Sequence, residues 1–333
     1  MLLNQLNIAV DLMGGDLGPS STVPASLEFA LSNPKVNITL VGDQDSVSLP
    51  ELPPNITFLH APDTISMSDT LSTVLRNKQK SSLWKVIELV STSECQACVS
   101  AGSTGAMMAI GRFILKTFPG IDRPAICKYV PTQTGPCLAL DLGANVDCSA
   151  EQLVQFAMMG TVLSKALKNI SEPKVALLNN GSEDTKGNEK IRFAASLLQD
   201  NPFINYTGYI EGNEVFLGKA DVMVCDGFVG NIALKISEGT ASFLAEGLRS
   251  ELDSSYWGKL VALIIKPLLK NWHRKFDPAV YNGASFLGLQ GTVVKSHGSA
   301  DARSFGFALE SSLEQARHNV PELINQHLVD AYF

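Results

Sequence analysis

Six short apolar segments of this chain end in turns that combine glycine with aspartate, asparagine or serine. The turns are MGGD at 13–16, SAGSTGA at 100–106, DLGAN at 141–145, NNGSEDTKGN at 179–188, DGFVGN at 226–231 and SHGS at 296–299. Helix-like stretches follow most of them, and strands that alternate with helices predict an α/β fold with a mostly parallel sheet. In such sheets ligands bind beyond the carboxyl ends of the strands, which is where these turns fall.

The turns are suited to binding a small anion. Glycine lets the backbone approach a ligand closely, and the first N–H groups of a helix have no partner within the helix. Neither GxGxxG followed by an acid on a second strand nor GxxxxGK[ST] occurs, so neither a dinucleotide nor a nucleoside triphosphate is indicated. One such turn is most often an ordinary cap, but six together predict a shared phosphate-sized site.

Composition excludes several classes of function. The net charge of −7 over 333 residues argues against general nucleic-acid binding. The N-terminal segment has no cationic start, and no run of about 20 residues is free of charges and helix breakers, so we expect neither a signal peptide nor a transmembrane helix. Six scattered cysteines predict reduced thiols in the cytoplasm. The histidines share no spacing, and the CxxC formed by Cys95 and Cys98 has no second ligand pair, so no metal site is expected.

Three side chains are candidates for catalysis. Lys186 is the one cation in the 179–188 turn and can neutralise a phosphate, although a solvated surface lysine fits the pattern equally well. Asn231 falls in the first turn of a predicted helix, where its amide can stabilise an oxyanion or simply cap the helix. His297 is the one histidine in a glycine turn and is the candidate for proton transfer, without an identifiable carboxylate partner.

The segment 256–276, YWGKLVALIIKPLLKNWHRKF, is basic and amphipathic in an otherwise acidic chain. It contains no acidic residue. At helical spacing its apolar residues form a stripe on one face, and several lysines lie on the opposite face. Pro267 is expected to break or restart the helix. We predict a surface for an anionic membrane or for a partner subunit, and the two roles are compatible. The residues predicted to form this surface are Trp257, Lys259, Leu260, Ile264, Leu268 and Trp272.

Taken together, the motifs resemble the bacterial phosphate acyltransferase family, the acyl-ACP:phosphate transacylases that start phospholipid synthesis. The residues that carry the resemblance are IAVDLMGGDLGP (8–19), SAGSTGA (100–106), DLGANVDCSAEQLVQFAMMG (141–160), KGNE (186–189), CDGFVGNIALK (225–235), YNGASFLG (281–288) and HGS (297–299). They span most of the chain in the order of the family. The chain departs from the family pattern at Ser103, where the family usually has asparagine, and at Asn180, where it tends to have an apolar residue.

The resemblance implies both a fold and a reaction. The fold is a three-layer α/β/α unit related to phosphotransacetylases and to isocitrate and isopropylmalate dehydrogenases, and the family is homodimeric. The reaction moves a long-chain acyl group reversibly from acyl carrier protein to inorganic phosphate, forms acyl phosphate and needs no cofactor. Family members associate peripherally with the membrane and supply a membrane glycerol-3-phosphate acyltransferase. We therefore expect residues 1–333 to form a single catalytic unit, with a helical protrusion over about 238–280 for dimer or membrane contact.

The expected site combines the turns with the three catalytic candidates. Lys186, Asn231 and His297 are predicted to be catalytic. The residues predicted to bind phosphate or substrate are Asp11, Gly14, Gly15, Gly102, Ser103, Thr104, Gly105, Asn145, Gly187, Asn188, Asp226, Gly227 and Gly230. Ionised Asp226 and Asp141 would repel a phosphate, so we expect them to accept N–H bonds and to shape the turns. Two alternatives remain: a phosphotransacetylase-like enzyme that uses acyl-CoA, and a membrane scaffold without catalytic activity.

Overall fold

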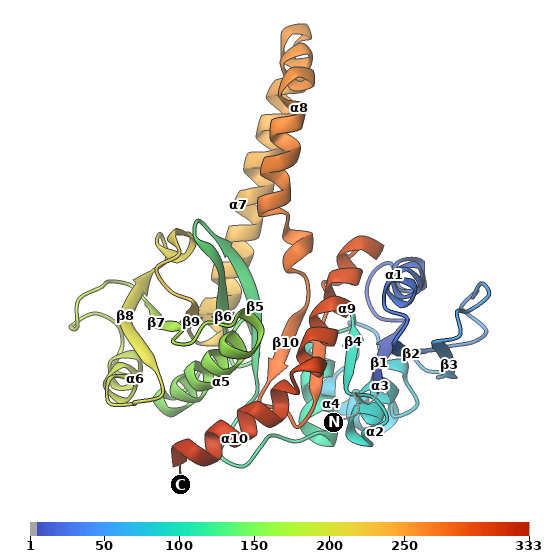
Figure 1. The fold of residues 1–333 in the computed structure, drawn as a ribbon, viewed down its shortest axis with the longest axis horizontal. Helices are drawn as coiled ribbons and strands as arrows, with labels where there is room; N and C mark the ends of the chain where they lie inside the picture. Colours follow the sequence, from blue (N-terminus) through green and yellow to red (C-terminus); the bar gives the residue numbers. More distant parts are fainter. Residues whose placement is uncertain (1–4, 333) are drawn as a thin grey trace.

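The structure, a computed structural model, describes residues 5–332 without the side chains of residues 269–276, 278 and 328–332. In this part of the chain eleven strands form one sheet in the order β3-β2-β1-β4-β11-β10-β5-β6-β9-β7-β8 (Figure 1). The strands are β1 (Leu6–Asp11), β2 (Val36–Gly42), β3 (Ile56–His60), β4 (Ala97–Ser100), β5 (Ala125–Thr132), β6 (Gly135–Leu140), β7 (Lys174–Asn179), β8 (Asn205–Glu211), β9 (Val222–Val224), β10 (Ala284–Leu287) and β11 (Thr292–Lys295).

Helices cover both faces of the sheet and extend beyond it (Figure 1). They are α1 (Pro19–Ser32), α2 (Leu71–Asn77), α3 (Ser82–Ser91), α4 (Thr104–Ile114), α5 (Ala150–Lys168), α6 (Glu189–Gln199), α7 (Gly227–Asp253), α8 (Tyr256–Phe276), α9 (Ala302–Arg317) and α10 (Val320–Tyr332), with 3₁₀ turns η1 (Val215–Leu217) and η2 (Pro278–Tyr281). Polar side chains start most of the helices. Ser103, Asn188 and Asp226, for example, each accept the N–H three residues further on.

The sheet consists of two parallel halves that run in opposite directions. β3, β2, β1, β4 and β11 are mutually parallel, and so are β6, β9, β7 and β8. β10 is antiparallel to both β11 and β5, and β5 is antiparallel to β6. Three consecutive reversals therefore separate the halves. The expected α/β fold with a mostly parallel sheet is confirmed, and β5 and β6 form an antiparallel hairpin.

The core lies on both sides of the strands, which gives three layers. In β1, Ile8 and Val10 pack in the cluster that includes Phe305 of α9, whereas Ala9 between them packs with Trp84 of α3 on the other face. All three β1 residues are fully buried. A strand that is covered on both faces reads as a continuous apolar run, which is why the sequence pattern located it.

Helices α7 and α8 form a hairpin that projects away from the sheet (Figure 1). With 27 residues, α7 is about 40 Å long at the usual rise of an α-helix. α8 continues through Pro267, so the break expected there is wrong. Proline removes one N–H donor, and the carbonyl freed by it belongs to Leu263, which is 68% exposed. That position allows water to replace the lost bond.

Candidate active site

The six glycine turns fall into two groups, each on three adjacent parallel strands. The first group comprises the turns after β1, β4 and β11, which contain MGGD, SAGS and SHGS. The second group comprises the turns after β6, β9 and β7, which contain DLGAN, DGFVGN and the 179–188 loop. Carboxyl ends of neighbouring parallel strands meet at the same edge of a sheet. No side-chain hydrogen bond in the described part of the chain joins one group to the other.

The first group is built around the buried carboxylate of Asp11, which is 1% exposed. Its Oδ2 accepts the Ser100 hydroxyl at 2.6 Å, and its Oδ1 accepts the N–H of Met13 at 3.1 Å. Burial raises the pKa of Asp11, while these donors act in the opposite direction. A Cβ on Gly14 would lie 2.6 Å from the Gly102 nitrogen. Asp11 and Gly14 therefore pack the β1 turn against the β4 turn.

The β11 turn closes this group. Gly15 has a φ of +89°, and a Cβ there would lie 2.8 Å from the carbonyl oxygen of Gly298, so only glycine suits this position. Asp16 donates its N–H to the same oxygen at 2.7 Å. The Nδ1 atom of His297 lies 2.9 Å from the Ser299 hydroxyl and accepts the Ser299 N–H at 3.3 Å. No carboxylate among the described residues pairs with His297.

Helix α4 begins at the β4 turn and points its first N–H groups into this region. The Ser103 hydroxyl accepts the Ala106 N–H at 3.4 Å, so serine caps the helix where the family usually has asparagine. The Gly102 N–H donates to the Ser100 hydroxyl oxygen at 2.9 Å. Thr104 and Gly105 occupy the first two helical positions, whose N–H groups have no intrahelical acceptor. These two groups are free to bind an anion.

Lys295, at the end of β11, is a charged residue of this group that the sequence interpretation missed. Its Nζ donates to the carbonyl oxygen of Ala101 at 3.2 Å and to that of Ser296. Burial lowers the pKa of Lys295 to about 8, and the charges of Asp16 and Asp11 act against that shift. A lysine at the end of an apolar strand and next to a predicted site turn is the signal that was available in the sequence.

The second group is built around Asp141, which is fully buried. Its Oδ1 accepts the N–H groups of Ile126, Gly143 and Ala144, and its Oδ2 accepts both the N–H and the side-chain amide of Asn145. The Asn145 amide also donates to Pro124. Burial raises the pKa of Asp141, and these donors oppose the shift. Asp141 and Asn145 thus shape the turn, and both N–H bonds of the Asn145 side chain are already used.

The start of α7 packs directly on this turn. The Gly227 N–H donates to the carbonyl of Asn145 at 2.8 Å, and a Cβ on Gly227 would lie 2.6 Å from that oxygen. A Cβ on Gly230 would overlap the carbonyl oxygen of Asp141. Asp226 accepts the Val229 N–H at 2.8 Å and caps the helix. The glycines and Asp226 therefore act through packing and capping, and they place Asn231 beside Gly143.

Several donors of the second group are left without an acceptor among the described residues. The Asn231 side chain is partly exposed, lies against Gly143 and makes no hydrogen bond. Lys186 is exposed and forms no ion pair, and its stem lies over Gly181. Asn179, at the end of β7, has a buried Nδ2 atom without a partner. β7 and β9 are neighbours in the sheet, so these donors belong to adjacent turns.

Hydrogen bonds made by its own residues hold the rest of the 179–188 loop. Gly187 has a φ of +83° and donates its N–H to the Asn180 side chain at 3.0 Å, which gives the unusual Asn180 a role in the turn. Asn188 caps α6 by accepting the Ile191 N–H at 2.9 Å. The loop therefore presents Lys186 from a hydrogen-bonded frame.

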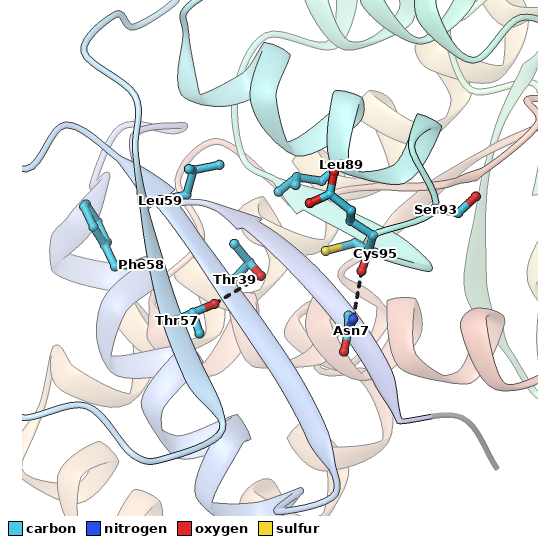
Figure 2. A pocket seen from close by; sticks show the side chains of 9 residues that line it. Asn7, Thr39, Thr57, Phe58, Leu59, Leu89, Ser93 and Cys95 are labelled. Carbon is cyan, nitrogen blue, oxygen red and sulfur yellow. Dashed lines mark hydrogen bonds between the residues drawn. The ribbon is translucent and has the colours of Figure 1, made fainter. Parts of the chain in front are cut away.

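A pocket of about 520 Å³ has a lining that contains no residue of either group (Figure 2). Its lining is Asn7, Thr39, Thr57, Phe58, Leu59, Leu89, Ser93, Glu94 and Cys95, from β1–β3 and the end of α3. None of the predicted site residues belongs to it. The part of the chain that the structure describes contains no cluster of three metal-ligating side chains and no helix long and apolar enough to span a bilayer.

Comparison with known proteins identifies the family. A family model described as fatty acid synthesis protein matches residues 6–323. A protein named phosphate acyltransferase from Teredinibacter turnerae is 44% identical, over 97% of this chain and 99% of the relative. Another of that name, from Nitrosococcus oceani, is 48% identical over 97% of this chain and 96% of the relative.

Solved structures share the fold at low sequence identity. A phosphotransacetylase from Streptococcus pyogenes superposes with a TM-score of 0.64 at 17% identity, covering 95% of each chain. A phosphotransacetylase from Staphylococcus aureus gives a TM-score of 0.60 at 16% identity, covering 94% of each chain. At such identities the likeness shows the fold alone, whereas the sequence matches extend over nearly the whole chain. The chain belongs to the phosphate acyltransferase family of fatty acid synthesis proteins and is an acyltransferase.

Proposed function

We propose that the protein transfers a long-chain acyl group from the thioester of acyl carrier protein to inorganic phosphate, reversibly, for phospholipid synthesis. The observation that carries the proposal is the set of unsatisfied donors in the second group: the Lys186 ammonium, the Asn231 amide and the buried Asn179 amide. Donors without internal acceptors, on turns that follow neighbouring strands, suit an anionic ligand and a developing oxyanion. The family membership supplies the reaction class.

The chemistry needs little beyond positioning. A phosphate oxygen attacks the thioester carbonyl carbon, the carbonyl oxygen takes up negative charge, and the carbon–sulfur bond then breaks to release the carrier thiol. Lys186 neutralises the phosphate, and Asn231 donates to the oxyanion. Phosphate is already a nucleophile, so holding it against the thioester supplies most of the rate gain. No cofactor takes part in this proposal.

In this proposal the first group, which belongs to the other parallel half of the sheet, also contributes to phosphate binding. The N–H groups of Thr104 and Gly105 bind phosphate oxygens at the start of α4. Because Nδ1 of His297 accepts an N–H from Ser299, its ring proton is assigned to Nε2, which can donate a hydrogen bond to the departing sulfur. The remaining predicted residues of both groups, from Asp11 to Gly230, hold these donors in place through the packing described above.

The α7–α8 hairpin is the proposed contact with other surfaces. Trp257, Leu260, Ile264 and Leu268 are 73%, 41%, 69% and 70% exposed, and Lys259 lies on the same helix. The Trp272 side chain lies outside the described residues. Exposed apolar side chains with lysines on one helix suit an anionic membrane surface and a second subunit. The protein is thus proposed to be a cytoplasmic homodimer, one catalytic unit per chain, bound peripherally near a membrane glycerol-3-phosphate acyltransferase.

The test incubates purified protein with acyl-ACP, with and without phosphate, and measures free carrier. We expect carrier release to depend on phosphate. Carrier release at the same rate without phosphate would contradict the transacylase function. A parallel reaction with acyl-CoA of the same chain length tests the donor. Faster transfer from acyl-CoA would favour the phosphotransacetylase-like alternative, whose support is the shared fold.

A further inference from the structure

Lys295 carries an ammonium group that touches two of the three turns of the first group. Its Nζ donates to the Ala101 carbonyl of the β4 turn at 3.2 Å and to the Ser296 carbonyl of the β11 turn. Asp11 and Asp16, at the end of β1 and in the turn after it, act on it electrostatically. With His297, these are the titratable groups that surround Lys295 from the elements packed against it.

The contact with Ala101 fixes the peptide that precedes α4. A trans peptide directs its C=O and N–H in opposite directions. In the Ala101–Gly102 peptide the C=O accepts from Lys295, while the N–H donates to the Ser100 hydroxyl oxygen at 2.9 Å. Ser100 in turn donates to Asp11 at 2.6 Å. The peptide plane is therefore held from both sides, immediately before the helix begins.

We infer that Lys295 is a positioning residue for phosphate in the acyl transfer, because it sets the direction of the free N–H groups at the start of α4. This inference rests on the proposed function, in which Thr104 and Gly105 bind phosphate oxygens. Lys295 acts through the Ala101–Gly102 peptide. Removing its charge changes the affinity for phosphate more than it changes the maximal rate.

The protonation of Lys295 gives this role a pH dependence. Burial lowers its pKa from an ordinary 10.5 to about 8, so the ammonium form disappears as the pH rises through about 8. A neutral amine is a weaker donor than an ammonium group, and the Ala101 carbonyl is then held less firmly. The KM for phosphate is expected to rise over this range. Arginine at position 295 stays charged and removes the pH effect.

The free energy of unfolding is expected to rise with pH, whereas the affinity for phosphate falls. The folded-state pKa of Lys295 lies below the unfolded value, so between about pH 8 and 10.5 the unfolded chain binds more protons than the folded chain. The contribution of Lys295 to the free energy of unfolding therefore increases with pH in this window, while phosphate affinity decreases. A lysine with a purely structural role would show the same rise in stability with pH, but no accompanying loss of phosphate affinity.

The experiment compares wild type, Lys295→Met and Lys295→Arg for KM and kcat towards phosphate across neutral and alkaline pH. Lys85→Met is the matched control, because Lys85 pairs with Glu88 on the surface of α3. We expect Lys295→Met to raise the KM for phosphate about 10- to 100-fold with a smaller change in kcat. Lys295→Arg is expected to retain the low KM and to lose its alkaline rise. The control behaves as wild type.

A second readout does not depend on turnover or on the arginine variant. Phosphate bound to the folded protein raises its melting temperature. The rise is expected in wild type and much reduced in Lys295→Met. An unchanged KM, pH profile and melting shift in Lys295→Met would overturn the inference and leave the proposed function intact. Absence of phosphate-dependent transfer in wild type would instead overturn the proposed function, and the melting shift would still decide the role of Lys295.

Discussion

Individual side chains of the turns divide into those that build the site and those left free to act in it. Asp141 and Asn145 satisfy each other and the surrounding backbone. Lys186 and Asn231 make no hydrogen bond in the described part of the chain, although they sit in equally ordered turns. A side-chain donor without an acceptor, in a turn whose other polar groups are hydrogen-bonded, is the arrangement expected of a binding residue.

Replacement of Lys186 by alanine tests this distinction. Loss of a cation that neutralises phosphate is expected to lower kcat/KM for phosphate about 100-fold, in the range seen when one stabilising donor is removed. Lys190→Ala is the matched control, since Lys190 is also exposed and pairs with Asp147 at 2.5 Å on the surface. A surface pair contributes about 0–1 kcal/mol. Equal effects of the two substitutions would contradict the role of Lys186.

The sequence indicated Lys186 and Asn231 because both stand in recognisable glycine turns. It could not separate a cap from a ligand, because that depends on which N–H groups find acceptors in the fold. Asp226, for example, is a cap, whereas Asn231 is free of capping. Lys295 was missed for a related reason. Its ammonium group contacts the β4 turn at Ala101, almost two hundred residues away in sequence, and no local pattern reports such a contact.

At the scale of elements, close packing of α7 on the 141–145 turn places Asn231. Gly230 faces the Asp141 carbonyl with no room for a methyl group. The same helix contains Gly239, where a methyl group would have no neighbouring atom within 4 Å. These two glycines therefore offer a controlled comparison on one helix.

Gly230→Ala is expected to destabilise the protein by about 1–3 kcal/mol through overpacking and to reduce acyl transfer. Gly239→Ala is expected to stabilise it by about 0.5–1 kcal/mol, because alanine is the better helix former at an exposed position. Denaturant unfolding measures both changes. A Gly230→Ala protein as stable and as active as wild type would show that the helix does not depend on this contact.

The sequence predicted most elements well where the apolar runs were continuous. The apolar run Thr292–Lys295, which precedes the SHGS turn, forms β11, and the polar residues near Lys78–Ser82 separate α2 from α3. β10 was not foreseen, because four residues between glycine-containing turns give no recognisable period. Its antiparallel pairing is what begins the reversal between the halves of the sheet.

At the scale of the whole molecule, the separation of the turns into two groups could not be derived from the sequence. Each turn lies at the end of its own strand, but strand order depends on pairings between segments far apart in the chain. β11, for instance, joins β4 across almost two hundred residues. The α/β class follows from local alternation, whereas the grouping of turns is a property of the complete sheet.

The hairpin offers a prediction at the same scale. Ile264→Glu combined with Leu268→Glu is expected to abolish binding to vesicles that contain anionic phospholipid, measured by flotation, while acyl transfer in solution persists. Leu31→Glu is the control, since Leu31 is also 70% exposed but lies on α1. Retained flotation together with a change from dimer to monomer, measured by light scattering, would assign the hairpin to the partner subunit and contradict the membrane role.

The central claim is that the free donors of the glycine turns bind phosphate. A crystal structure with phosphate or sulfate bound tests it most directly. We predict an anion within hydrogen-bonding distance of the Lys186 ammonium, at the turn after β7. An anion that occupied a different part of the molecule, with Lys186 still unbonded, would contradict the claim.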